Sequence, residues 1–113
     1  MKYFTRLAAA GLLGVFFMQP AHAAAPLEPQ ALKALFPGTF QALVYGYTVR
    51  FVAKRDGSLV GQSQQGTDTG EWSIQEGQLC IMLSSWLSGR TSCSGVVQQG
   101  DWYRAENVVF RKH

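Results

Sequence analysis

The feature that most constrains this chain is the stretch 70–93, GEWSIQEGQLCIMLSSWLSGRTSC. It contains both cysteines, Cys80 and Cys93, and two of the three tryptophans. Glu76-Gly77 is typical of a tight turn, and residues 79–83 form the most apolar run outside the N-terminal region. We therefore expect three consecutive strands here, the last two joined by a disulfide between Cys80 and Cys93.

The N-terminal residues have the order of an export signal. Lys2 and Arg6 give a positive start, residues 7–18 form an uncharged apolar run, and Ala21-His22-Ala23 is a small-residue cleavage pattern. An apolar run of this length is too short to span a bilayer. We expect residues 1–23 to be a signal peptide, and the mature protein to be periplasmic or secreted with no membrane span.

Removal of that signal changes the charge of the protein. The whole chain has 10 Lys and Arg against 7 Asp and Glu, a formal net charge of +3. Residues 24–113 keep every acid but lose Lys2 and Arg6, which leaves a net charge of +1. The remaining bases are scattered, whereas nucleic-acid binding needs a basic stripe with interleaved aromatic residues. The sequence therefore predicts no nucleic-acid partner.

The two cysteines are expected to be structural. A domain of this size is marginal without support, and an exported chain folds in an oxidising compartment that favours disulfides. The rival interpretations are a zinc site and a redox pair. Two cysteines with no neighbouring histidine cannot complete a tetrahedral zinc site. The spacing from Cys80 to Cys93 is also not that of a Cys-x-x-Cys motif. We expect a disulfide, no metal and no cofactor.

The pattern of residues predicts one short helix followed by strands. Residues 24–29 are expected to be a flexible lead, and residues 30–36 (QALKALF) have apolar side chains at helical spacing. Asp56-Gly57 predicts a two-residue hairpin loop, and residues 64–69 are expected to form a polar loop. The strands are expected at residues 39–45, 47–53, 58–63, 71–75, 78–84, 91–98 and, as one or two strands, 102–110.

These strands predict a mainly β fold for residues 30–113, a single disulfide-bonded domain. We expect a small antiparallel β-barrel or sandwich of seven to eight strands with one short N-terminal helix. Trp72 alternates with Ile74 along an expected strand and is therefore assigned to the core.

Few side chains suit catalysis. His113 is the one histidine of residues 24–113, so Ser-His-Asp and Cys-His mechanisms lack a positioned base. Asp68-Thr69-Gly70 matches the active-site tripeptide of aspartic proteases, in which two carboxylates share a proton. Here it follows polar residues instead of an apolar strand, so we expect Asp68 and Thr69 to bond to their own backbone in a loop. The sequence predicts a protein that is not an enzyme.

Trp86 and Arg90 are the candidate contact residues. They lie in the expected loop between the two bridged strands. Trp and Arg often dominate the energy of protein contacts, which favours a contact role for this loop. The alternative is that Trp86 folds back as a lid over one end of the core.

Several positions carry a family resemblance: residues 70–72 (GEW), residues 79–80 (LC) and Cys93. This order of Gly-x-Trp, a turn, Leu-Cys and a second cysteine resembles a set of small exported proteobacterial proteins that are classified as a domain of unknown function. Residues 38–39 (GT) are similar to the residues before the first strand in that family. After Cys80 the family often has a tryptophan, where this chain has Ile81 and Met82. The resemblance implies a small periplasmic β fold and no particular activity.

Three classes of function remain. The first is a non-enzymatic binding module that holds a periplasmic or extracellular protein, a glycan or a small apolar ligand through its loops or barrel mouth. The second is an inhibitor of a cell-wall hydrolase or protease, and the third an enzyme with a carboxylate-only site. A hollow interior favours a ligand-binding module, whereas a single projecting loop favours an inhibitor.

Overall fold

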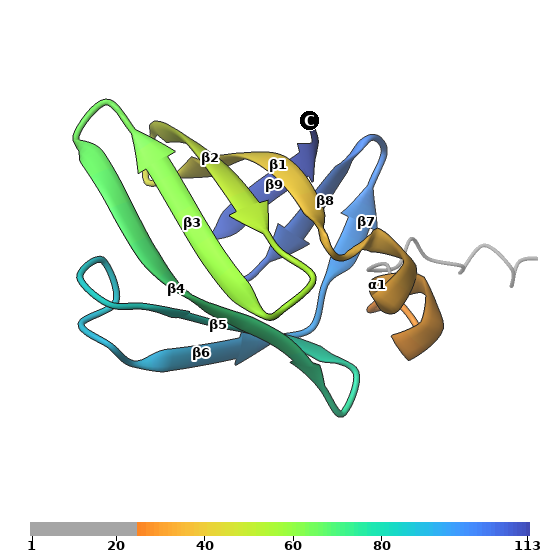
Figure 1. The fold of residues 1–113 in the computed structure, drawn as a ribbon. Coiled ribbons are helices and arrows are strands. Elements are labelled where there is room, and N and C mark those ends of the chain that lie inside the picture. Colours follow the sequence, from red (N-terminus) through yellow and green to blue (C-terminus); the bar gives the residue numbers. More distant parts are fainter. Residues whose placement is uncertain (1–24) are drawn as a thin grey trace, which may run out of the picture.

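The computed structural model describes residues 25–113 as one curled antiparallel sheet with a short helix at one end (Figure 1). The expected signal peptide lies outside the described residues. The elements are α1 (Pro29–Leu35), β1 (Gly38–Val44), β2 (Tyr47–Ala53), β3 (Ser58–Ser63), β4 (Gly66–Gln75), β5 (Gln78–Leu83), β6 (Thr91–Ser94), β7 (Val97–Gln99), β8 (Trp102–Ala105) and β9 (Val108–Lys112).

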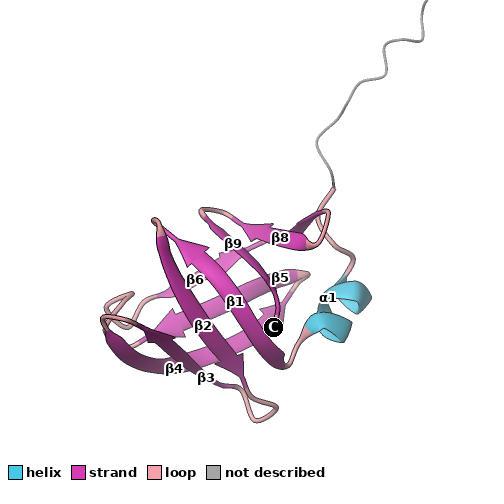
Figure 2. Cartoon of the chain, turned by 90° about the horizontal axis from the view of Figure 1, so that it is seen from above, coloured by secondary structure: helices cyan, strands magenta, loops and turns pink. Residues whose placement is uncertain are grey.

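The strands follow the order β6-β5-β4-β3-β2-β1-β9-β8-β7 across the sheet. Strands consecutive in sequence pair with each other, except β6 and β7, which are the two edges of the sheet. The one pairing between strands distant in sequence is that of β1 with β9 within residues 25–113. Only Gly95 and Val96 separate the two edge strands in sequence, so the sheet curls until its edges approach each other. The result is a half-barrel with an inner and an outer face (Figure 2).

The prediction of a mainly β, antiparallel fold with one short helix is confirmed for residues 25–113, but these residues form nine strands instead of seven to eight. The expected strand 91–98 is divided, because its first half pairs with β5 and its second half with β8 on the far edge of the sheet. The expected strand region 102–110 forms both β8 and β9.

The prediction of a polar loop at residues 64–69 is wrong, because β4 begins at Gly66 and pairs with β3 from that residue onward. Thr67 and Thr69 are exposed, whereas Asp68 between them is buried. The alternation of a strand is therefore present in this segment. The polar composition concealed it, because the buried residue is itself an acid.

Two of the expected turns form hairpin loops of different length. Glu76-Gly77 forms the expected two-residue turn, with both residues at positive φ (54° and 80°), as a type I′ turn requires. Asp56-Gly57 also lies in a hairpin, but the loop spans four residues, 54–57, instead of two. The Asp56 carboxylate accepts hydrogen bonds from the backbone N–H (2.9 Å) and hydroxyl (2.7 Å) of Ser58, which stabilises the wider loop.

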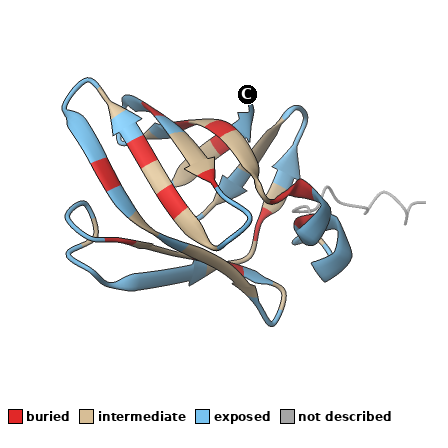
Figure 3. Cartoon of the chain, in the orientation of Figure 1, coloured by how far each residue is buried: buried red, intermediate tan, exposed pale blue. Residues whose placement is uncertain are grey.

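The core lies on the inner face of the sheet at the α1 end. Leu32 and Leu35 of α1 are buried there, and the Phe36 ring that follows lies 4.6 Å from Phe40 and 5.5 Å from Trp72 between ring centroids. Along β3, buried positions alternate with partly exposed ones (Figure 3). A helix this short is stable only through such packing, so α1 exists because it covers the end of the half-barrel.

The disulfide between Cys80 and Cys93 is confirmed. The two residues are direct cross-strand partners in β5 and β6, with Cα atoms 4.0 Å apart. The bridge ties the edge strand β6 to β5, the one strand of residues 25–113 with which β6 pairs. It therefore supports an edge of the sheet, where a strand has a backbone partner on one side.

We expect the double variant Cys80→Ser, Cys93→Ser to lose about 3 kcal/mol of unfolding free energy, because the unfolded chain regains the entropy of the open loop. Urea unfolding followed by circular dichroism measures this loss. Reductant should destabilise the wild-type protein by a similar amount and leave the double variant unchanged. Equal stability of the two proteins under oxidising conditions would contradict the prediction.

Candidate functional site

The two ends of the half-barrel differ in what covers them (Figure 1). At one end lie α1 and the β2–β3, β4–β5 and β7–β8 turns. At the other lie the β1–β2, β3–β4, β5–β6 and β8–β9 connections, and no helix of residues 25–113 covers them. We call this second end the open end. The one described helix is also too short to cross a membrane.

A cavity of about 400 Å³ lies inside the half-barrel and is reached from the open end. Its wall is formed mainly by aromatic and aliphatic side chains from the inner faces of the strands. Examples from β1, β2, β5 and β9 are Phe40, Val49, Phe51, Ile81, Val108 and Phe110. Small-molecule sites in proteins have volumes of about 300–1,000 Å³ and similarly apolar walls.

Three aromatic side chains lie at the mouth of this cavity. Tyr45 belongs to the β1–β2 turn, Tyr47 begins β2, and Trp86 belongs to the β5–β6 loop. They are 79%, 53% and 38% exposed, respectively. The mouth also has polar side chains on the neighbouring turns, among them Gln65 and Glu106. A ligand that enters the cavity therefore passes aromatic surface before it reaches the apolar wall.

Trp86 packs against the sheet with one side of its ring. The ring lies over Gly61 of β3 and meets Phe51 edge-on, with 6.4 Å between ring centroids. A Cβ atom on Gly61 would lie 2.6 Å from the Trp86 ring and 2.9 Å from that of Phe51. The absence of a side chain at Gly61 therefore provides the space that Trp86 occupies at the mouth of the cavity.

Asp68 holds the backbone of the loop that carries Trp86. Asp68 is 6% exposed as a residue, and its carboxylate accepts hydrogen bonds from the backbone N–H groups of Trp86 (2.8 Å), Ser85 (3.0 Å) and Thr69 (3.0 Å). Asp68 stands opposite Gly61 in the β3–β4 pair, so it projects from the same face of the sheet that Trp86 covers. The β5–β6 loop is therefore anchored to β4 close to its tryptophan.

These bonds also determine the acidity of Asp68. The N–H of Trp86, followed by those of Ser85 and Thr69, lowers the pKa of the Asp68 carboxyl below its ordinary value of 3.8, although burial acts in the opposite direction. Asp68 is expected from the sequence to bond to the backbone next to it, and one of its three hydrogen bonds, that from the Thr69 N–H, does so. The other two donors are 17 and 18 residues away, and Asp68 lies in a strand instead of a loop.

The two candidate contact residues differ in their relation to the cavity. Trp86 lines the cavity, whereas Arg90 is exposed and does not line it. Sequence reasoning missed Tyr45, Tyr47 and Gly61 as site residues. A sequence signal for Tyr47 exists. The alternation along β2 places it on the same face as Val49 and Phe51, and its position beside the β1–β2 turn places it at the mouth of the cavity. No three His, Cys, Asp or Glu side chains gather as a metal site within residues 25–113.

Comparison with protein families, with curated proteins and with solved structures gives no match for this chain. The resemblance to a family of exported proteins therefore depends on the motif residues alone. The structure explains two of them. A side chain on Gly70 would overlap the Met82 backbone carbonyl of β5, and the indole N–H of Trp72 donates a hydrogen bond of 2.7 Å to the Lys54 carbonyl.

The loop anchored by Asp68 is expected to loosen in acid. A carboxylate whose pKa is lowered by folding stabilises the fold above its ordinary pKa of 3.8, and this stabilisation is lost as the pH falls through the lower, folded value. We therefore expect the stability difference between the wild type and Asp68→Asn to be positive at pH 7 and to shrink below pH 3.8.

Urea unfolding at several pH values measures this difference, and the NMR signal of the Trp86 indole reports on the loop. Asp68→Asn should shift that signal at neutral pH. The control Asp101→Asn, in the β7–β8 turn at the other end, should not. A stability difference that is constant from pH 7 to pH 3 would contradict the anchoring role.

Proposed function

We propose that this protein is a non-enzymatic binding protein that holds a small apolar ligand inside the half-barrel. The observation that carries the proposal is the cavity of about 400 Å³, with an apolar wall and access from the open end. The burial of an apolar ligand there contributes about 25 cal/mol for each Å² of apolar surface removed from water.

The cavity remains hollow because several inner positions have small side chains. Ala42 of β1 and Ala105 of β8 contribute one methyl group each. Ser92 and Ser94 are the inner-face residues of β6, where they pair with Ile81 and Leu79 of β5. Larger side chains at these positions would fill a half-barrel of this size.

The same features favour an apolar ligand over the other partners considered. A glycan site needs many hydrogen-bonding groups, and the wall offers few. An inhibitor needs a projecting loop, whereas the Trp86 ring lies against Gly61 and Phe51 and its loop is anchored by Asp68. Inhibition of a cell-wall hydrolase or protease remains a prediction from sequence. We place the protein in the periplasm or outside the cell, and its disulfide is compatible with that location.

The neutral fluorescent probe N-phenyl-1-naphthylamine tests this function. We expect one saturable site per chain, with enhanced probe fluorescence because the cavity excludes water. Ser92→Phe should weaken binding by about tenfold or more, since its ring enters the cavity beside Ile81.

The matched control is Thr91→Phe on the same strand, where the new ring faces outward beside Met82. It should bind the probe as the wild type does. Urea unfolding confirms that both variants are folded. Absence of saturable binding in the wild type, or an equal loss in both variants, would overturn the proposal.

A further inference from the structure

The charge that lines the cavity is negative. Within residues 25–113, Glu106 in the β8–β9 turn is the one charged residue among the lining residues. No Lys, Arg or His of residues 25–113 lines it. The buried acid Asp68 accepts hydrogen bonds from the backbone of the β5–β6 loop, and its lowered pKa keeps it negative at neutral pH. The mouth is therefore negative, although residues 24–113 have a net charge of +1.

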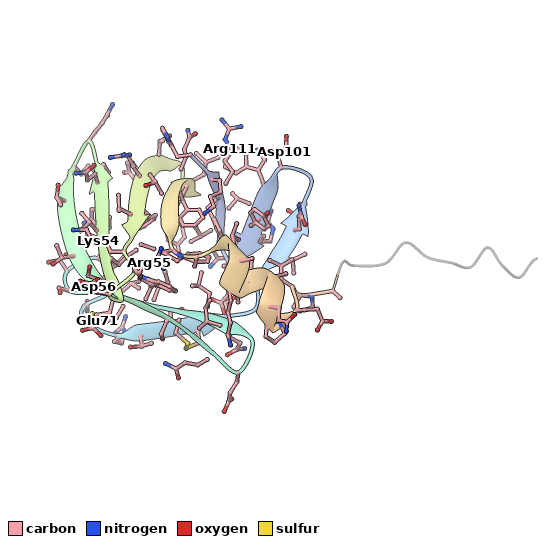
Figure 4. The ribbon with its side chains drawn as sticks, turned by 45° about the vertical axis from the view of Figure 1, so that its right-hand side comes forward. Lys54, Arg55, Asp56, Glu71, Asp101 and Arg111 are labelled. Carbon is pink, nitrogen blue, oxygen red and sulfur yellow. A yellow bond between two sulfur atoms is a disulfide. The ribbon has the colours of Figure 1, made fainter. Side chains whose placement is uncertain are left out.

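The basic side chains have other positions. Lys54 and Arg55 belong to the β2–β3 turn at the α1 end, near Asp56 (Figure 4). Arg111 lies over the Trp102 ring, 4.8 Å from its centroid, and Lys112 donates a hydrogen bond of 3.2 Å to the Pro37 carbonyl. Arg90 is in a loop of the open end but does not line the cavity.

Glu106 and the two exposed tyrosines are neighbours at the mouth. Val44 pairs with Tyr47 on one side and with Val108 on the other, so the β1–β2 and β8–β9 turns lie side by side. The first turn carries Tyr45, and the second carries Glu106. Tyr45 and Tyr47 are 79% and 53% exposed, so much of their ring surface is open to a ligand.

This arrangement discriminates between head groups. The faces of aromatic rings attract cations, most strongly where water is partly excluded. A carboxylate at the mouth adds attraction for a positive group and repulsion for a negative one. An anionic head group, such as that of a fatty acid, would find no cation among the lining residues. It would lose its hydrating water and gain no partner in exchange, which is unfavourable.

We infer that the cavity takes a cationic amphiphile, an alkylammonium compound whose chain fills the apolar interior and whose head lies among Glu106, Tyr45 and Tyr47. This inference rests on the proposed function of the same cavity. The ligand has an ammonium head group, which aromatic side chains and a carboxylate can bind jointly. This head is joined to an apolar chain that fits a volume of about 400 Å³.

Three ligands with the same chain separate the head group from the chain: octyltrimethylammonium, octan-1-ol and octanoate. Isothermal titration calorimetry at pH 7 and low ionic strength measures their affinities. We expect the ammonium compound to bind about tenfold more tightly than octanoate, with octan-1-ol between them. Added salt should reduce the ammonium affinity and leave that of octan-1-ol unchanged, since screening acts on charges.

Variants at the mouth assign the preference to residues. Glu106→Gln should lower the affinity for octyltrimethylammonium about fivefold and change that for octan-1-ol by less than about twofold. Tyr47→Leu, which removes the ring, should lower the ammonium affinity more than Tyr47→Phe, which keeps it. The control Asp101→Asn removes a carboxylate from the β7–β8 turn at the opposite end and should change none of the three affinities.

The outcomes distinguish this inference from the proposed function. Tighter or equal binding of octanoate, or an unchanged preference in Glu106→Gln, would overturn the ligand class while the apolar cavity remains a binding site. Failure of all three ligands to bind would overturn both. Selective binding of the ammonium compound that is lost in Glu106→Gln supports both.

Discussion

The pairing of β1 with both β2 and β9 is the constraint on which the rest of this structure depends. It joins the meander β1–β6 to the short meander β7–β9 and makes one sheet from two parts of the chain. Because β6 and β7 are separated in sequence by only two residues, this sheet must curl. Curling gives it an inner face, and the core and the cavity both lie on that face.

The inner face has two unequal halves because only one end of it is covered. At the α1 end, Leu32 and the rings of Phe36, Phe40 and Phe110 pack together, and Tyr103 stacks on Phe110 with 5.6 Å between ring centroids. At the open end no helix of residues 25–113 covers the connections between the strands. Phe40 and Phe110 belong both to the core and to the wall of the cavity. The packed core therefore forms the floor of the cavity.

The β5–β6 loop shows how the hollow half is kept in shape. The disulfide ties β6 to β5 on the outer face, and the Asp68 carboxylate holds the loop from the neighbouring strand β4. Trp86 is then fixed over Gly61 without being fully buried. One covalent bond and one buried carboxylate thus position an aromatic side chain at the mouth of the cavity. A mobile loop would have to become ordered when the ligand binds, and the entropy lost in doing so would weaken binding.

The sequence by itself determined the local structure: the short helix before the strands, the turn at Glu76-Gly77 and the pairing of the two cysteines. These follow from turn chemistry, residue alternation and the fact that two cysteines allow one bridge. It did not reveal that the strand expected at residues 71–75 begins at Gly66, the division of residues 91–98, or the roles of Asp68 and Gly61. Those depend on partners such as Trp86 and β8, which are distant in sequence, so only the tertiary structure decided where the cavity lies and which residues form its mouth.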